Sequence, residues 1–294
     1  MKSSTSHGER CPRKIPSTAP RAQYGRVPPS VPDVFAGMTL RGLSRRDLVR
    51  MAGGVIAGPL LAACGASRSG PGERLLLPTP LPGDRLPPGL HTLGTGGERD
   101  GVVSVPASAG ASPLIVMLHG AGGTGRRAAR LIGPAAEPAG CIVLAPDSRG
   151  ATWDAVTGPF GPDVAFVSRA LAQVLARCAV DIARVALAGF SDGATYALGL
   201  GLANGDRFTH LLAFSPGFLI PGRRAGTPDI FVSHGIADDV LPIATCSRKL
   251  VPALRRKGYR VRYREFEGRH EVPPAIVREG LAWFLDRPSA PDPA

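Results

Sequence analysis

The stretch Val185-Ala186-Leu187-Ala188-Gly189-Phe190-Ser191-Asp192-Gly193-Ala194-Thr195 decides the fold class of this chain. An apolar run ends at a serine that has glycine two positions to each side, and a segment rich in Ala, Leu and Gly follows. This pattern predicts a tight strand-to-helix turn, in which Gly189 and Gly193 are needed because a Cβ would collide across the turn. The hydroxyl of Ser191 would then project from a sheet edge, beside the backbone N–H of Asp192 at a helix N-terminus. The alternative is an ordinary glycine-rich turn after a buried strand.

The positive charge of the chain is concentrated near its start. The 294 residues include 35 Lys or Arg and 23 Asp or Glu, a formal net charge of +12, which by itself favours nucleic acid or an anionic membrane surface as a partner. Residues 1–63 account for more than half of the excess, with ten Lys or Arg against three Asp or Glu. The remainder has no basic run long enough for a nucleic-acid footprint, so we expect no nucleic-acid partner.

The basic segment near the start has the pattern of an export signal. Arg45-Arg46 precedes the apolar stretch 51–63, which is too short to span a bilayer as a helix. We interpret 38–64 as a twin-arginine signal peptide in which Leu61-Ala62-Ala63-Cys64 resembles the lipobox of bacterial lipoproteins. Lipid on Cys64 would hold the protein at the cell envelope, outside the cytoplasm, as its one contact with a membrane. The alternative is an ordinary signal peptide whose small residues precede a cysteine.

Composition divides the rest of the chain. Residues 1–37 are rich in Pro, Ser and Arg without apolar periodicity, and we interpret them as a disordered extension or a misassigned start, with Met38 as the true first residue. Residues 65–98 are dominated by Gly, Pro, Ser and Leu and predict a tether. Residues 99–287 suit one globular domain, and 288–294 a disordered tail.

Three of the five cysteines lie in the globular domain, an odd number for an exported protein. Cys141 opens an apolar strand and is expected in the core. The sequence leaves open whether Cys178 and Cys246 form a disulfide, and it does not indicate the oligomeric state. The spacing of these cysteines is not that of a metal site, so neither a metal nor another cofactor is expected.

Short apolar runs alternate with helical patterns throughout this domain. The runs are continuously apolar, which predicts a mostly parallel sheet with helices on both faces. In such sheets the chemistry gathers at the carboxyl ends of the strands. The predicted strands are 102–105, 114–118, 142–145, 185–188, 211–214, 230–232 and 261–266, and the predicted helices are 126–138, 164–178, 192–203, 243–257 and 274–285.

Groups that a serine nucleophile would need follow three of the strands. After 114–118, a glycine-rich loop could present the N–H of Ala121 to a developing oxyanion. The competing interpretation, a phosphate-binding loop, lacks the required Lys-Ser/Thr pair. After 230–232 come the adjacent carboxylates Asp238 and Asp239. Because the catalytic order in this architecture is Ser, acid, His, only His270 lies far enough along the chain to be the base.

With these motifs the chain resembles bacterial α/β-hydrolase esterases of the carboxylesterase/phospholipase and poly(3-hydroxybutyrate)-depolymerase-like group. The resemblance covers residues 100–286 and implies an α/β-hydrolase fold, with Ser191 as nucleophile, Asp238 as orienting acid and His270 as base. Asp238 fits the family's His-Gly-x-x-Asp pattern, which Asp239 does not. The motifs are His119-Gly120-Ala121-Gly122-Gly123, Gly189-Phe190-Ser191-Asp192-Gly193, His234-Gly235-Ile236-Ala237-Asp238 and Gly268-Arg269-His270-Glu271-Val272-Pro273.

The activity implied by the resemblance is hydrolysis of carboxylic esters through an acyl-enzyme. The N–H groups of Ala121 and Asp192 would form the oxyanion hole. Asp192 departs from the family, in which an amide is common at this position, and its carboxylate would discourage anionic acyl groups. Two alternatives remain open, namely a non-catalytic, surface-tethered binding protein on the same fold, and a thioesterase or peptidase with the same triad.

The loops around the site suggest the kind of substrate. Trp153, Phe160 and Phe218 are candidates for the wall of a substrate pocket. The connection 215–229 is too short for a lid domain, so we expect an open site that accepts small or polymer-linked esters. His119 and His234 each precede a glycine at a strand end and are expected to be structural.

Overall fold

A computed structural model describes residues 72–76, 83–95, 97–108 and 110–286. The predictions for 1–37, for the signal peptide with Cys64 and for 288–294 lie outside the described residues. None of the helices in the described part combines the length and apolar character needed to cross a bilayer.

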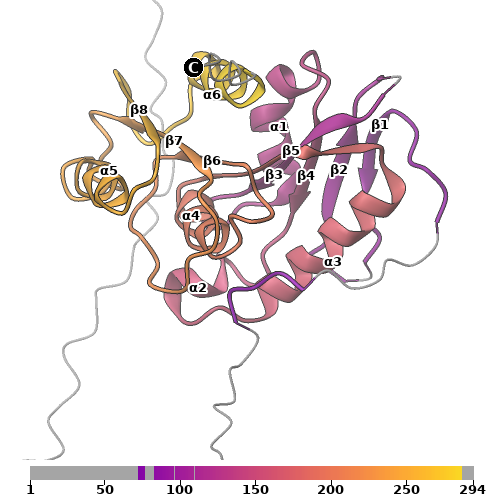
Figure 1. Ribbon diagram of the computed structural model, residues 1–294, viewed down its shortest axis with the longest axis horizontal. Helices are drawn as coiled ribbons and strands as arrows, with labels where there is room; N and C mark the ends of the chain where they lie inside the picture. The colour runs from indigo at the N-terminus through magenta and orange to yellow at the C-terminus, as the bar shows by residue number, and fades with distance from the viewer. Residues whose placement is uncertain (1–71, 77–82, 96, 109, 287–294) are drawn as a thin grey trace, which may run out of the picture. The chain divides into compact units, whose positions relative to one another are not determined.

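The described chain forms one mixed sheet with helices on both faces (Figure 1). Its strand order is β1-β2-β4-β3-β5-β6-β7-β8; β1–β2 and β2–β4 pair antiparallel and all other neighbours are parallel. The mostly parallel sheet predicted from the sequence is therefore confirmed. The elements are β1 (Gly89–Thr92), β2 (Gly101–Val105), β3 (Ser112–Leu118), α1 (Gly125–Ala136), β4 (Ile142–Pro146), α2 (Asp154–Thr157), α3 (Pro162–Arg177), β5 (Val180–Phe190), α4 (Asp192–Ala203), β6 (His210–Phe214), β7 (Asp229–Gly235), α5 (Ser247–Arg256), β8 (Val261–Phe266) and α6 (Pro274–Leu285).

The central strands are apolar throughout because helices cover both of their faces. Every residue of β3 and of β4 is buried. One core cluster packs α1 and α6 on one face of the sheet, and a second packs α3, α4 and α5 on the other; Figure 1 shows α1 and α6 above the sheet and α3 and α4 below it. No helix or strand is inserted between β6 and β7, so no lid domain covers this edge within the described chain.

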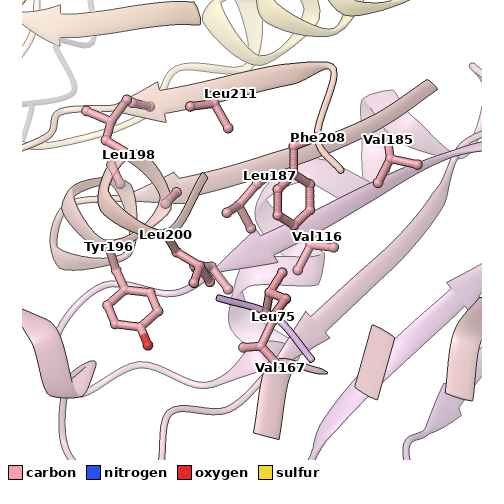
Figure 2. Close-up of a cluster of buried hydrophobic side chains, with 14 of the residues drawn as sticks. Leu75, Val116, Val167, Val185, Leu187, Tyr196, Leu198, Leu200, Phe208 and Leu211 are labelled. Carbon is pink, nitrogen blue, oxygen red and sulfur yellow. The ribbon is translucent and has the colours of Figure 1, made fainter. Parts of the chain in front are cut away.

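A short N-terminal segment, residues 72–76, is part of the second cluster; we call it the strap. Its Leu75 is fully buried, and Figure 2 shows it among side chains from β3, α3 and α4. The Leu75 N–H donates to Oδ1 of Asn204 at 2.8 Å, and Nδ2 of Asn204 donates to the Glu73 carbonyl at 2.6 Å. Burial of a leucine contributes about 1.5–3 kcal/mol.

The strap and β1 both fall within 65–98, the range predicted as a tether. That prediction does not hold for these residues, because 72–76 is fixed to α4 and 89–92 forms an edge strand of the sheet. An isolated leucine in a Pro/Gly-rich segment gives no periodic signal. Its burial depends on side chains of β3, α3 and α4, and its hydrogen-bond partner Asn204 lies 129 residues along the chain.

The parallel registers bring the carboxyl ends of the strands to one edge. The pairs nearest this edge are Leu118 with Gly189, Phe190 with Phe214, Phe214 with Ser233, and Gly235 with Phe266. The segments that follow β3, β5, β7 and β8 therefore begin side by side. These are the segments that carry the predicted site residues.

Candidate active site

Ser191 lies in a strained turn between β5 and α4. Its backbone has φ 58° and ψ −123°, and a positive φ is rare for a residue with a Cβ. A Cβ on Gly189 would lie 2.2 Å from the Gly193 carbonyl oxygen, and one on Gly193 would lie 2.4 Å from the Leu118 carbonyl oxygen. Both glycines are therefore required by close backbone approach, as the sequence pattern predicts. Strain of this kind costs about 1–3 kcal/mol and occurs mainly at functional sites.

His270 and Asp238 meet Ser191 at this edge. Nε2 of His270 lies 2.9 Å from Oγ of Ser191, and Nδ1 lies 2.7 Å from Oδ2 of Asp238. A carboxylate only accepts hydrogen bonds, so Nδ1 carries the proton and Nε2 is free to accept the serine O–H. The structure thus brings together, in the geometry of a triad, the three residues named from the sequence.

The Asp238 carboxylate is held by several donors. Its Oδ1 accepts the N–H groups of Val240 at 3.0 Å and Leu241 at 2.8 Å. Burial acts to raise the pKa of this carboxyl, but the hydrogen bonds from His270, Leu241 and Val240 outweigh burial and bring the pKa below its ordinary value. The neighbouring Asp239 is exposed and pairs with Arg269. Asp238, and not Asp239, therefore lies against His270.

His234 is a buried residue that contacts the carboxylate of Asp238. Its side chain is fully buried, with Nε2 2.8 Å from the Leu241 carbonyl and 3.2 Å from Oδ2 of Asp238. Nδ1 lies 2.7 Å from Oγ of Ser247. Burial lowers the pKa of His234, so the neutral ring donates from Nε2 and accepts the Ser247 hydroxyl at Nδ1. His234 therefore contacts the acid and does not reach the serine.

Two backbone N–H groups next to Ser191 have no acceptor within the described part of the protein. A Cβ on Gly120 would lie 3.2 Å from Cβ of Ser191, so the glycine-rich loop runs directly past the serine. Within this loop the N–H of Gly122 donates to Ala151 and that of Gly123 to Gly120. Among the described residues, no protein acceptor takes the N–H of Ala121 or of Asp192. These two were the donors expected from the sequence.

His119, at the end of β3, is built into the loop. Nδ1 donates to the Gly120 carbonyl at 2.8 Å, and Nε2 accepts the Ser148 N–H at 3.0 Å. The ring is buried, and burial lowers its pKa. Both nitrogens are occupied by the backbone, which leaves the neutral ring no position from which to act on a substrate.

The three aromatic candidates for the pocket wall have different surroundings. Trp153 is fully buried and donates from Nε1 to the His119 carbonyl at 2.8 Å. The expectation that it lines an open pocket is wrong, because its ring packs between His119 and Tyr196. Phe160 is half-buried, with its ring centroid 5.3 Å from that of Tyr196. Phe218 is exposed.

Phe190 is an aromatic neighbour of the site that the sequence analysis did not single out. Its ring lies 4.8 Å from the His270 ring, centroid to centroid. It also lines a cavity of about 200 Å³ together with Ala121, Ala128 and Leu131. Its position was the available signal, because Phe190 is the last residue of β5 and directly precedes Ser191.

Other features lie away from the triad. A cavity of about 710 Å³ is lined by His210 and Asp229, the first residues of β6 and β7, and so lies at the opposite edge of the sheet. No group of three or more His, Cys, Asp or Glu within the described chain could hold a metal ion. Cys141, Cys178 and Cys246 are buried and free, which answers the open question of a Cys178–Cys246 disulfide.

Comparison with known proteins gives matches in structure but not in sequence. No protein-family model matches the chain, and no curated protein matches it in sequence. Among solved structures, esterase PE8 is 24% identical with a TM-score of 0.52, the match covering 62% of this chain and 96% of that one. The fluorophosphonate-binding serine hydrolase F of Staphylococcus aureus is 14% identical with a TM-score of 0.54, covering 68% and 100%.

A third solved structure is a truncated carbohydrate esterase from gut microbiota. It is 14% identical with a TM-score of 0.55, the match covering 70% of this chain and 98% of that one. At such identities the likeness concerns the backbone arrangement. The sheet order, the strained serine turn and these matches together establish that the chain has the α/β-hydrolase fold.

Proposed function

We propose that this protein is a serine hydrolase that cleaves carboxylic esters. The observation that carries the proposal is the continuous hydrogen-bonded line from Ser191 through His270 to Asp238. Three structurally similar proteins are named as esterases or serine hydrolases, which supports the same reaction class.

In the proposed mechanism His270 removes the proton of Ser191 as Oγ attacks the ester carbonyl. Asp238 holds the ring with Nδ1 protonated and stabilises the imidazolium that forms. The N–H groups of Ala121 and Asp192 bind the developing oxyanion. His270 then delivers the proton to the leaving alcohol, and the same residues activate a water molecule that hydrolyses the acyl-enzyme.

We propose that the acyl group enters the cavity beside the loop, because that cavity is lined by Phe190 and Ala121; the acyl group must then be small. The cavity volume of about 200 Å³ lies below the range of about 300–1,000 Å³ usual for drug-sized ligands. The absence of a lid in the described chain leaves room for a bulky or polymeric alcohol part. A thioesterase or peptidase would use the same residues, whereas a non-catalytic binding protein would not need the hydrogen bond between Ser191 and His270.

The decisive experiment compares Ser191→Ala with Ser215→Ala on p-nitrophenyl acetate and butyrate. Ser215 is a matched control because, like Ser191, it is buried, directly follows a strand of the sheet and has a positive φ. We expect Ser191→Ala to lose at least a thousand-fold in kcat, the order found when a triad member is removed. A fluorophosphonate probe should label the parent and not this variant. Parental turnover in folded Ser191→Ala would refute the proposal, and a binding protein would show no turnover in any variant.

We also propose that the protein is exported and lipid-anchored through Cys64. The support is the twin-arginine pair, the short apolar stretch and the Leu61-Ala62-Ala63-Cys64 motif. Metabolic labelling with a radioactive fatty acid should mark the parent chain and not Cys64→Ser. Label retained by the variant would contradict the anchor.

A further inference from the structure

The loop between β4 and α2, residues 147–153, is hydrogen-bonded to residues on both sides of Ala121, the first candidate oxyanion donor. The Ala151 carbonyl accepts the Gly122 N–H at 2.7 Å. On the other side of Ala121, Nε2 of His119 accepts the N–H of Ser148 at 3.0 Å. The carbonyl of His119 accepts the Nε1–H of Trp153 at 2.8 Å. The segment that carries the Ala121 N–H is therefore fixed by this loop at the residues that flank it.

The same loop reaches the second candidate donor through one side chain. Oγ1 of Thr152 lies 2.6 Å from Oδ2 of Asp192, and the hydroxyl must be the donor because a carboxylate only accepts. Asp192 is the first residue of α4 and carries the other oxyanion N–H. Ala151 and Thr152 are consecutive, so a single peptide unit links the two donor segments.

The base of the loop is anchored in the core. Asp163 of α3 is only 1% exposed, and its two carboxylate oxygens accept the N–H groups of Arg149 at 2.6 Å and Asp154 at 2.7 Å. On the sheet side, the Asp147 N–H donates to the Asp100 carbonyl at 3.0 Å. Both ends of the loop are thus held by neighbouring elements, and the loop can transmit a fixed geometry to the groups it contacts.

We propose that Thr152 is a positioning residue for the oxyanion hole and that residues 147–153 set the spacing between its two donors. This inference rests on the proposed ester hydrolysis. Oxyanion stabilisation depends on donors that are already aimed where charge develops, so no reorganisation is needed during the reaction. Without the Thr152 hydroxyl, the first turn of α4 loses its link to the loop, and the Asp192 N–H is free to drift from the Ala121 N–H.

The hydrogen bond and the charge of Asp192 are separated by a double-mutant cycle. Asp192→Asn keeps an acceptor oxygen for Thr152 and removes the charge, whereas Asp192→Ala removes both. Thr152→Val deletes the hydroxyl with little change of shape, and Thr152→Ser restores it. If the hydrogen bond between Thr152 and residue 192 sets kcat, Thr152→Val should lower kcat in the wild-type and Asp192→Asn backgrounds. It should have no further effect on kcat in the Asp192→Ala background, where the acceptor is missing.

The experiment measures kcat and KM for p-nitrophenyl acetate with the full chain, together with thermal unfolding of each variant. We expect Thr152→Val to lower kcat about ten-fold, less than the 10²–10³-fold for complete loss of one donor. KM should stay within about two-fold, since the ground-state carbonyl gains little from the oxyanion donors. Thr152→Ser should recover most of the lost rate.

Three results overturn the inference. The first is a Ser191-dependent turnover that Thr152→Val leaves unchanged. The second is an equal effect of Thr152→Val in the wild-type and Asp192→Ala backgrounds, which would show that the side chains do not act together. In both cases the proposed hydrolysis stands. The third is the absence of any Ser191-dependent turnover in the parent, in which case the proposed function fails and the inference with it.

Discussion

Substitution of Gly193 by alanine tests whether the serine turn and the glycine-rich loop must touch. A Cβ at this position would lie 2.4 Å from the Leu118 carbonyl oxygen and 2.5 Å from that of His119. Ordinary van der Waals contact of a Cβ begins at 3.4 Å, so the start of α4 and the end of β3 must separate by about 1 Å. The neighbours on the strand side are backbone atoms, which leaves no flexible side chain to absorb the displacement.

That separation moves the Asp192 N–H away from the Ala121 N–H. Misplacement by about 1 Å lowers rates on the order of a hundred-fold, which corresponds to about 2.7 kcal/mol of barrier. Overpacking of this kind also lowers the free energy of unfolding by about 1–3 kcal/mol. We therefore expect a folded but less stable protein with kcat/KM reduced about a hundred-fold.

The assay combines ester hydrolysis with urea unfolding, so that loss of fold and loss of alignment are measured separately. Gly158→Ala is the matched control, because the nearest atom to its added Cβ, the Asp154 carbonyl oxygen, lies at the ordinary distance of 3.7 Å. Its φ of −158° suits any residue. If folded Gly193→Ala kept kcat/KM within about three-fold of the parent, the close contact would not control the oxyanion donors.

Two further predictions concern stability. Leu75→Ala should reduce the free energy of unfolding by about 2–4 kcal/mol, because it empties a fully buried position in the second core cluster. Leu76→Ala is the control, because this residue is 77% exposed and its loss should leave urea unfolding almost unchanged. Equal effects of the two substitutions would mean that the strap is not packed against the domain. The second prediction concerns pH. The pKa of Asp238 is lowered in the folded protein, so the unfolded chain binds a proton at this carboxylate more readily. The stability that the carboxylate contributes is therefore present above its unfolded pKa of about 3.9 and is lost as the pH falls below that value. Urea unfolding at pH 6 and pH 3 should accordingly show a smaller pH-dependent loss in Asp238→Asn than in the parent, and an equal loss would remove Asp238 as a contributor.

The fold could be predicted from sequence because its main signals are local. Continuous apolar runs between helical patterns require a sheet that is covered on both faces, and the glycine spacing around Ser191 follows from contacts within a few residues. His270 could be named because it is the one histidine that follows the candidate acids along the chain. Asp238 was preferred to Asp239 only through the resemblance to a family with the His-Gly-x-x-Asp pattern. Their positions in the structure agree with that expectation, and their catalytic roles stay a prediction.

Features that depend on contacts between distant elements could not be predicted. Trp153 stands in a loop and was expected at a pocket wall, but its ring is enclosed by His119 and Tyr196, which lie on other elements. Thr152 belongs to no recognisable motif, and its link to Asp192 exists only because β4 and β5 lie in one sheet. The burial of Leu75 likewise requires the end of α4, far along the chain.

The strap has a consequence for how far the segment before it can reach. Asn204, which holds Leu75, directly follows α4, and this helix of 12 residues extends about 18 Å from the serine turn. Residues 65–72 separate Cys64 from Glu73 and span at most about 30 Å, against about 120 Å for a free segment reaching residue 98. The strap thus reduces, about four-fold, the greatest distance that the chain allows between Cys64 and the first residue that contacts the domain. That contact, between Glu73 and Asn204, lies at the end of α4 opposite the serine turn.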